Sequence, residues 1–245
     1  MENNCYDRIA WDYHLKRKKP WKALEEFLDH LKEKKYNFKG YCIDLGCGSG
    51  RNFTIINNLN NKLIGIDNSI EFLNIAKSNL NDINHYSKID VDNIQLILGD
   101  LEYIPIKAKV INNIFSIAAV HHIKSKERRQ EVFTKISEKL THNGFIILTL
   151  WRKWQSKFRK YFFFDWFKRK FSRKYKNRQK KIGLSEFGDK YIPWTLSKEK
   201  KTYNRFYHFF SKRELKNLLK SYEIKEFKIM GGPSNKDNFF VVASL

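Results

Sequence analysis

One segment limits the folds open to this chain more than any other. Residues 44–50 read Asp-Leu-Gly-Cys-Gly-Ser-Gly, directly after the apolar run 41–45 and before a segment with helical apolar spacing, 51–60. Glycines there permit a tight turn and a close approach of the backbone to a ligand, and the N–H groups that open the helix attract an anion. The segment therefore predicts a strand, a ligand-binding turn and a helix, the first unit of an α/β fold.

The rest of the chain alternates short apolar runs with segments of helical spacing. The runs predict strands at 41–45, 62–67, 94–98, 112–118 and 144–150, and the spacing predicts helices at 21–34, 51–60, 70–80 and 125–140. Strands joined by helices of crossover length form right-handed βαβ units, so we expect a parallel sheet covered on both faces. A helix at 212–220 and two runs at 222–230 and 238–244, joined by the turn-rich residues 231–235, predict a terminal antiparallel hairpin.

These elements predict an α/β chain with a single domain over residues 1–245, interrupted by a basic aromatic insertion at 151–182. Five parallel units and a closing hairpin give a seven-stranded, doubly wound sheet, the Rossmann-like plan of class I methyltransferases. A length of 245 residues suits one such domain and is too short for two ordinary ones.

The cysteines and the N-terminal residues indicate the cellular compartment of the protein. Cys5, Cys42 and Cys47 form no C-x-x-C pair, so we expect neither a disulfide framework nor a metal site, and we place the protein in the reducing cytoplasm. The first residues lack the basic-then-apolar order of a signal peptide. No apolar run approaches the roughly 20 residues that a membrane span needs.

Basic residues are concentrated in the insertion. Of the formal net charge of +22, residues 151–182 supply +13, from 14 basic residues and one acid, Asp165. Eleven aromatic residues stand among them. Phosphate neutralisation combined with base stacking uses this mixture, so a nucleic acid is the favoured partner. Two other interpretations stay open: an amphipathic helix whose aromatic face packs on the sheet, and contact with an anionic membrane surface.

Three acidic residues stand where predicted strands end: Asp44, Asp67 and Asp100. A carboxylate after the second strand can bind both hydroxyls of a ribose, as in nicotinamide sites, but the spacing resembles the motif set of proteins that bind S-adenosylmethionine (SAM). The resemblance implies that Asp44 and the glycine loop hold the methionine end, Asp67 the ribose, and Asp100 with Leu101 the adenine. The predicted cofactor residues are Asp44, Gly46, Cys47, Gly48, Gly50, Asp67, Asn68, Asp100, Leu101 and Ser116.

The ligand crevice of such a sheet lies at the carboxyl ends of the first and fourth strands, where strand order reverses. The fourth strand leads into His121 and His122. This pair could act as a base or as donors to an anionic substrate, or could simply be exposed at a helix start. Two chemistries are disfavoured. The chain lacks the Pro-Pro-aromatic motif of amine methylation, and its cysteines lie only near the N-terminus, in the first strand and in the loop, which disfavours methylation of pyrimidine carbon 5.

More distinctive motifs are spread along the chain. They are Tyr6-Asp7-x-Ile9-Ala10, Arg17-x-x-Pro20-Trp21, the glycine loop, residues 116–122, Glu127-Arg128-Arg129, Ile192-Pro193-Trp194, Arg205-Phe206-Tyr207-His208 and Asp237-Asn238-Phe239. In this order they resemble the tRNA wobble-uridine carboxymethyl methyltransferases, a family that includes a free-standing eukaryotic enzyme and the methyltransferase half of an AlkB-type hydroxylase. The insertion is longer and more basic than in that family.

The resemblance implies methyl transfer from SAM to the carboxylate of 5-carboxymethyluridine at the tRNA wobble position, giving the methyl ester. A carboxyl group with a pKa near about 4 is already an anion at neutral pH, so no general base is needed. The candidates for binding the anionic groups of the substrate are Arg17, His121, His122, Arg205 and His208. Trp194 and Tyr207 are candidates for stacking on the base or for core packing.

The resemblance also implies a partner, a small zinc-ribbon activator protein that pairs with a sheet edge. Residues 93–98 would form that edge, unless residues 81–93 cover it. Two other functions stay open. One is a SAM-dependent methyltransferase of a small or lipid-soluble substrate at a membrane surface, and the other is a non-catalytic RNA-binding protein with the methyltransferase fold.

Overall fold

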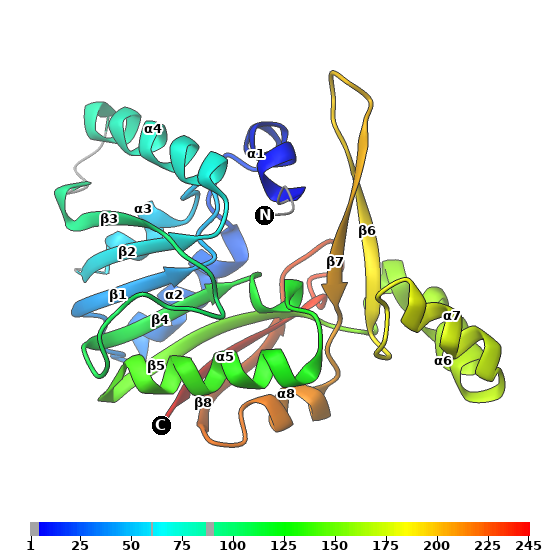
Figure 1. Ribbon diagram of the computed structural model, residues 1–245. Helices are drawn as coiled ribbons and strands as arrows, with labels where there is room; N and C mark the ends of the chain where they lie inside the picture. Colours follow the sequence, from blue (N-terminus) through cyan, green and yellow to red (C-terminus); the bar gives the residue numbers. More distant parts are fainter. Residues whose placement is uncertain (1–4, 60, 87–90) are drawn as a thin grey trace.

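A seven-stranded sheet forms the centre of the molecule (Figure 1). The computed structural model describes residues 5–59, 61–86 and 91–245. In sheet order the strands are β3 (Ile94–Leu98), β2 (Asn61–Asp67), β1 (Gly40–Leu45), β4 (Ile111–Ile117), β5 (Leu140–Trp151), β9 (Asn238–Ser244) and β8 (Glu223–Met230). The first five are parallel, whereas β9 runs antiparallel to β5 and β8. The predicted sheet and its terminal hairpin are confirmed.

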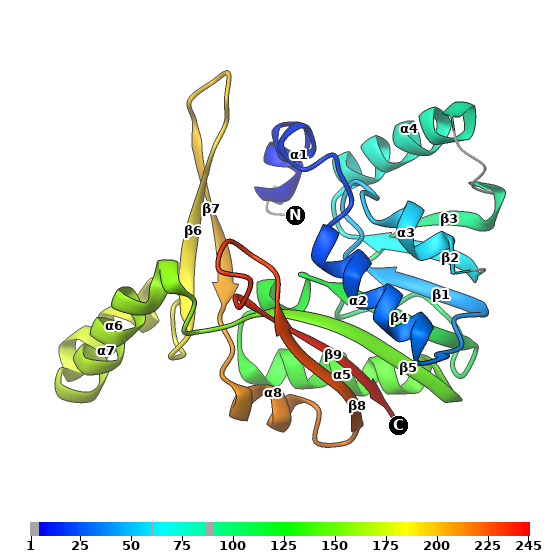
Figure 2. The ribbon, with the colours of Figure 1, turned by 180° about the vertical axis from the view of Figure 1, so that it is seen from behind.

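Apolar cores lie on both faces of the sheet. On one face, α5 (Lys126–Lys139) and α8 (Lys212–Leu218) bury side chains such as Phe133 and Leu215. On the other face lie α2 (Lys22–Glu33), α3 (Phe53–Asn57) and α4 (Ile70–Tyr86) (Figure 2). Phe27 and Phe53 are almost fully buried there. Burial of each such side chain contributes about 1.5–3 kcal/mol to the free energy of folding. The helices therefore pack their apolar sides on the two faces of the sheet.

Most predicted boundaries agree with the structure to within two residues, and three do not. Within the predicted helix 51–60, α3 is only five residues long, because asparagines on its C-terminal side favour turns. The helix predicted at 70–80 continues to Tyr86. Strand β5 begins at Leu140 instead of residue 144, since Leu140 pairs with Ile111 across a register shift.

Serine caps fix the start of both helices on the α5 face. Ser125 Oγ accepts a hydrogen bond of 3.3 Å from the Arg128 N–H, and Ser211 with Glu214 forms a reciprocal capping box. The Glu214 carboxylate also accepts hydrogen bonds from Lys153 Nζ at 2.9 and 3.0 Å. This cap therefore ties α8 to the segment that follows β5.

Several elements lie outside the doubly wound sheet, beyond the carboxyl ends of its parallel strands (Figures 1 and 2). Helix α1 (Cys5–Lys16) packs beside α4, and β6 (Asp189–Thr195) pairs with β7 (Thr202–His208) in a separate antiparallel hairpin that the sequence analysis does not predict. Helices α6 (Arg159–Phe171) and α7 (Arg173–Lys181) form an arm, residues 159–181, at the base of this hairpin. Short 3₁₀ turns occupy Val91–Asn93, Val120–His122 and Ser156–Phe158.

Most of the basic insertion folds into the two helices of the arm. The arm does not lie along the sheet as a covering helix but projects away from it (Figure 2), and Phe162 is the only one of its aromatic rings that is buried. None of the helices in the described ranges combines the length and the apolar character that crossing a membrane requires.

Candidate active site

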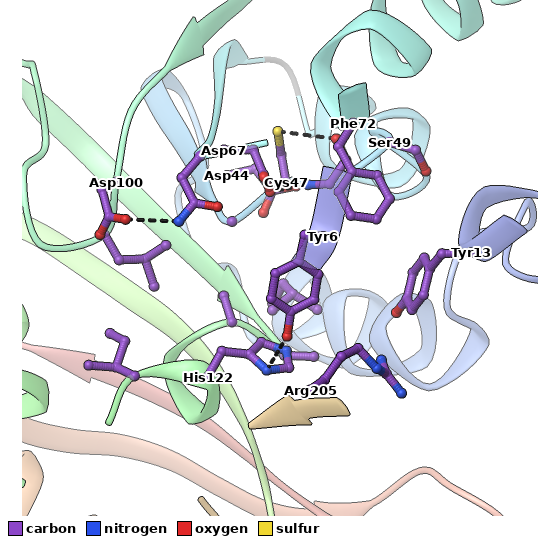
Figure 3. Close-up of a pocket in the computed structure, with 18 of the residues that line it drawn as sticks. Tyr6, Tyr13, Asp44, Cys47, Ser49, Asp67, Phe72, Asp100, His122 and Arg205 are labelled. Atoms are coloured by element: carbon purple, nitrogen blue, oxygen red, sulfur yellow. Dashed lines mark hydrogen bonds between the residues drawn. The ribbon is translucent and has the colours of Figure 1, made fainter. Parts of the chain in front are cut away.

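A cavity of about 520 Å³ opens at the carboxyl ends of β1, β2 and β4 (Figure 3). The loops after these strands line one side, and α1 and β7 contribute to the other. Eight of the ten predicted cofactor residues line it: Asp44, Gly46, Cys47, Gly48, Asp67, Asn68, Asp100 and Leu101. Ser116 and Gly50 do not, because Ser116 is fully buried within β4 and Gly50 lies against the ring of Phe53.

Asp67 joins the first two loops of the cavity. Its Oδ2 accepts a hydrogen bond of 2.8 Å from the Gly48 N–H, and its Oδ1 accepts one of 2.9 Å from the Ser69 N–H. Burial raises the pKa of Asp67 to about 6, although these N–H groups act in the opposite direction. Each carboxylate oxygen keeps a second lone pair, so Asp67 can still accept hydrogen bonds from the two hydroxyls of a ribose.

Asp44 is the most deeply buried acid of the cavity. Its side-chain Oδ1 has no hydrogen-bond partner in the part of the chain that the structure covers. Burial, with a further contribution from Asp67, raises its pKa to about 7. Nearby, Gly48 has φ +55°, and a Cβ there would meet nothing within 4 Å. The site therefore combines a carboxylate oxygen that has no hydrogen-bond partner in the described residues with open space above a glycine backbone.

The third loop holds Asp100 in a fixed orientation. Asn68 Nδ2 donates a hydrogen bond of 2.8 Å to Asp100 Oδ2, and the Glu102 N–H donates one of 2.8 Å to Asp100 Oδ1 (Figure 3). Leu101 lines the same part of the cavity. A carboxylate beside an apolar side chain can bind the amino edge of an adenine and cover one face of the ring.

Tyr6 and His122 meet at the end of the cavity away from the acids. The Tyr6 hydroxyl lies 2.7 Å from His122 Nδ1, and the Phe206 carbonyl oxygen lies 3.0 Å from the same nitrogen. Because a carbonyl only accepts, we assign the ring hydrogen to Nδ1. Burial lowers the pKa of His122 to about 4, so the ring is neutral at neutral pH and Nε2 is an acceptor. In this state Nε2 is not a donor to an anion, and the alternative role of His122 as a base stays a prediction.

Arg205 supplies the positive charge at this end. It is 5% exposed, and its Nη1 donates a hydrogen bond of 2.7 Å to the Tyr207 hydroxyl. The guanidinium lies 4.8 Å from the centre of the Trp194 ring and 5.9 Å from that of Tyr13. Its Nε has no hydrogen-bond partner, and within the described ranges no carboxylate pairs with it. A buried cation in this state favours binding of an anion.

Comparisons with known proteins agree with this geometry. Residues 43–148 match the family model described as a methyltransferase domain. The chain is 27% identical to the tRNA (carboxymethyluridine(34)-5-O)-methyltransferase of Schizosaccharomyces pombe, over 98% of this chain and 94% of that protein. It is 28% identical to the Saccharomyces cerevisiae protein of the same name, over 81% of this chain and 57% of that protein.

Solved structures share the fold. A SAM-dependent methyltransferase from Methanosarcina mazei superposes with a TM-score of 0.67 at 15% identity, over 87% of this chain and 96% of that one. The chain has the fold of the class I methyltransferases. SAM is the methyl donor of this class, and the residues present fit it. Asp44 Oδ1, which has no hydrogen-bond partner among the described residues, suits the amino group of the methionine part, and the space above Gly48 admits a ligand against the backbone.

Three of the predicted substrate residues do not line the cavity. Arg17 is exposed and its Nη1 donates to the Lys16 carbonyl oxygen at 3.0 Å. His121 lies behind His122 and stacks on Tyr207, with ring centres 5.0 Å apart. His208 is 1% exposed, and its Nδ1 lies 2.7 Å from Asp189 Oδ1. This buried contact between β6 and β7 places His208 at the base of the hairpin, and the structure does not bring it to the cavity where the substrate contact is predicted.

Helix α1 contributes two cavity residues that were not among the predicted site residues. Tyr6 and Tyr13 of this helix line the cavity, and Tyr6 already stands in the first motif of the family resemblance. The spacing of Tyr6 and Tyr13, seven residues apart, places them on the same side of one helix, which is the signal that could have identified both. Trp194, predicted to stack on the base, instead packs beside Tyr13 with ring centres 4.9 Å apart and lies over Arg205.

Proposed function

We propose that the chain transfers a methyl group from SAM to the carboxylate of 5-carboxymethyluridine at the wobble position of tRNA, forming the methyl ester. The observation that carries this proposal is the buried guanidinium of Arg205, which lines the same cavity as the cofactor loops and has no carboxylate partner in the described residues. The similarity to the two fungal methyltransferases over most of the chain supports the choice of substrate.

Cofactor binding is assigned to the acids and the glycine loop. Asp44 would hold the amino group of the methionine part, Asp67 the ribose hydroxyls, and Asp100 with Leu101 the adenine. When bound, SAM supplies an electrophilic methyl group on a positively charged sulfur. The hydrogen bonds from Gly48 and Ser69 hold the Asp67 carboxylate in place before the cofactor arrives, so little ordering remains to be done on binding.

Arg205 would position the substrate carboxylate. Its guanidinium offers a planar set of donors that matches a carboxylate or a phosphate, and the aromatic rings around it keep it in one orientation. A carboxylate is an anion at neutral pH and needs no base, so the chain contributes alignment of the nucleophilic oxygen with the methyl group. The neutral His122 fits this requirement, because it adds no second positive charge that would weaken the nucleophilic oxygen.

The test is transfer of labelled methyl from SAM to two preparations of one tRNA, the first carrying the free carboxymethyl acid and the second already esterified. We expect label in the wobble nucleoside of the first preparation and none in the second. Asp67→Asn serves as the matched variant that should lose cofactor binding. Equal labelling of both preparations, or label outside the wobble nucleoside, would contradict the proposal.

The activator partner is part of the same proposal. Strand β3 lies at the edge of the sheet, and Leu98 at its end is 58% exposed. An open edge strand with an exposed apolar residue favours pairing with another chain. Part of the alternative cover, residues 81–93, lies outside the described residues. Co-purification with a zinc-ribbon activator should be lost in Leu98→Lys and kept in Val110→Lys, a substitution at another exposed apolar position.

We also place the reaction in the cytoplasm. The three cysteines are free thiols, as a reducing compartment requires. Fractionation of cells that express the full chain would test this assignment, and recovery with an organelle would contradict it.

A further inference from the structure

The arm, residues 159–181, is held rigid by its single acid. Asp165 is 1% exposed and accepts hydrogen bonds from Arg169 Nε at 2.7 Å and from the Tyr175 hydroxyl at 2.9 Å. Arg169 Nη2 also donates to the Leu184 carbonyl oxygen at 2.9 Å. One carboxylate thus connects α6, α7 and the segment that leads to the hairpin, and it is no longer available to neutralise the other cations of the arm.

The positive charge of the insertion is almost entirely uncompensated. Of its 14 basic residues, only Lys153 and Arg169 form an ion pair with a carboxylate in the described ranges. On the outer part of the arm, Arg169, Lys170, Arg173, Lys176, Asn177 and Lys180 line a groove of about 410 Å³. Positions 173, 176 and 180 follow the helical spacing of α7 and so lie on one side of that helix, and Arg169 of α6 joins them in the groove.

A second groove combines cations with aromatic rings. It measures about 790 Å³ and is lined by Arg152, Trp154, Arg159, Lys160, Phe163 and Phe164. Phe163 and Phe164 are more than half exposed, although large aromatic side chains usually bury most of their surface. Exposed rings beside cations suit the faces of unpaired bases and the phosphates between them.

The order of these residues favours RNA over a lipid surface. At about 100° per residue, Lys160 falls between Phe167 and Phe171 on the helical wheel of α6, and Lys170 falls between Trp166 and Phe163. Lys170 Nζ lies 5.3 Å from the centre of the Trp166 ring. A helix that enters a membrane interface keeps an unbroken apolar face, whereas this face is interrupted by charges that would have to leave water.

The arm lies at the same end of the molecule as the cavity and is connected to it through the hairpin (Figure 2). Lys190 of β6 lies over the Tyr161 ring of α6, with its Nζ 3.5 Å from the ring centre. Arg205, on the paired strand β7, lines the cavity. A nucleic acid bound on the arm can therefore continue toward the catalytic cavity without crossing the sheet.

We infer that the arm is a second RNA-binding site, in which the basic groove neutralises backbone phosphates and the aromatic groove stacks unpaired bases. This inference rests on the proposed function and identifies the surface that holds the tRNA body while the wobble nucleoside occupies the cavity. It predicts that affinity for tRNA and the chemistry of methyl transfer depend on separate parts of the chain.

The test of the basic groove is the variant K170Q/R173Q/K176Q/K180Q, which keeps helix-favouring residues at exposed positions. Its matched control is K39Q/K77Q/K107Q/K220Q, four exposed lysines outside the insertion. We expect the groove variant to bind tRNA about tenfold or more weakly and to reduce the slope of log Kd against log salt by about 3 to 4. The KM for tRNA should rise while kcat at saturation stays within twofold, and the control should change neither quantity.

A second variant, F163L/F164L, tests stacking. We expect weaker tRNA binding, by about fivefold or more, with an unchanged salt slope, because no charge is removed. Unaltered tRNA binding in the groove variant, with active wild-type enzyme, would overturn the inference and leave the proposed function intact. An inactive wild-type enzyme would instead count against the proposed function. Loss of binding to vesicles containing anionic lipid, with tRNA binding unaffected, would assign the arm to a membrane and overturn the inference.

Discussion

The guanidinium of Arg205 donates a hydrogen bond of 2.7 Å to the Tyr207 hydroxyl, and both residues come from β7. Three aromatic rings, from Tyr13, Trp194 and Tyr207, lie within 6 Å of this cation. Their faces stabilise the charge by cation–π attraction without consuming the donors that a carboxylate would occupy. The Arg205 guanidinium is therefore stabilised in the buried lining of the cavity and can still bind an anionic substrate.

Replacement of Arg205 should therefore separate substrate binding from cofactor binding. We expect Arg205→Gln to lower kcat/KM for the tRNA by about 10- to 100-fold, the range for losing a hydrogen bond to a charged group. The Kd for SAM should stay within about twofold. Tyr207→Phe removes only the supporting hydroxyl and should cost a few-fold. An Arg205→Gln enzyme with normal kcat/KM would show that the guanidinium does not bind the substrate.

Cofactor affinity should depend on pH through Asp44 and Asp67. Their pKa values in the folded protein are about 7 and about 6, and a cationic ligand binds better to the ionised carboxylates. Affinity for SAM should therefore fall as pH drops, by about 25-fold from about pH 7.5 to about pH 5.5 through Asp44 alone. Calorimetric titration measures this directly. Asp44→Asn should bind more weakly at all pH values and lose most of the dependence, and an unchanged profile would refute the assignment.

Two glycines of the loop should respond differently to alanine. A Cβ at Gly48 meets nothing within 4 Å, whereas a Cβ at Gly50 would lie 2.4 Å from the ring of Phe53. Both residues have positive φ, so each substitution costs about 1 kcal/mol in backbone strain. We expect Gly48→Ala to fold with a slightly lower Tm and to lose SAM affinity. Gly50→Ala should lose clearly more stability, and the reverse order of stabilities would contradict the geometry.

The sheet and the cofactor loops are predictable from the sequence because each rests on local signals. Apolar runs of strand length, crossover helices and the acids at 44, 67 and 100 all specify structure within short segments. The β6–β7 hairpin is not predictable in this way. Pro193 interrupts its first strand, and both strands stand apart from the main sheet, so neither shows a simple alternation of buried and exposed residues.

Site residues outside the loops depend on tertiary packing that spacing does not reveal. His121 and His122 are adjacent in sequence, yet only His122 lines the cavity, because the short 3₁₀ turn after β4 directs the two rings differently. His208 and Arg205 both lie on β7, and Asp189 on the paired strand captures His208. Because Asp189 binds His208, Arg205 is the residue of β7 that can bind the substrate. Asp189 is 19 residues from His208 in the sequence, so the sequence did not indicate this contact.

Asp12 should control the position of the hairpin. Its Oδ2 accepts a hydrogen bond of 2.8 Å from Trp194 Nε1, and its Oδ1 accepts one of 2.8 Å from the Ser197 N–H. We expect Asp12→Ala to speed amide exchange in β6 and β7 by about tenfold, with the central sheet unaffected. Asp29→Ala, which removes an exposed acid paired with Lys32, is the matched control. Equal exchange in the two variants would show that α1 does not hold the hairpin.

The nature of the bond formed to the transferred methyl group tests the central claim most directly. Labelled methyl is transferred from SAM to tRNA that carries the free carboxymethyl acid, and the isolated tRNA is then treated with mild alkali. A carboxyl methyl ester hydrolyses under these conditions, so the account predicts that the label leaves the tRNA as volatile methanol. Label that stays on the tRNA through alkali would contradict methylation of a carboxylate.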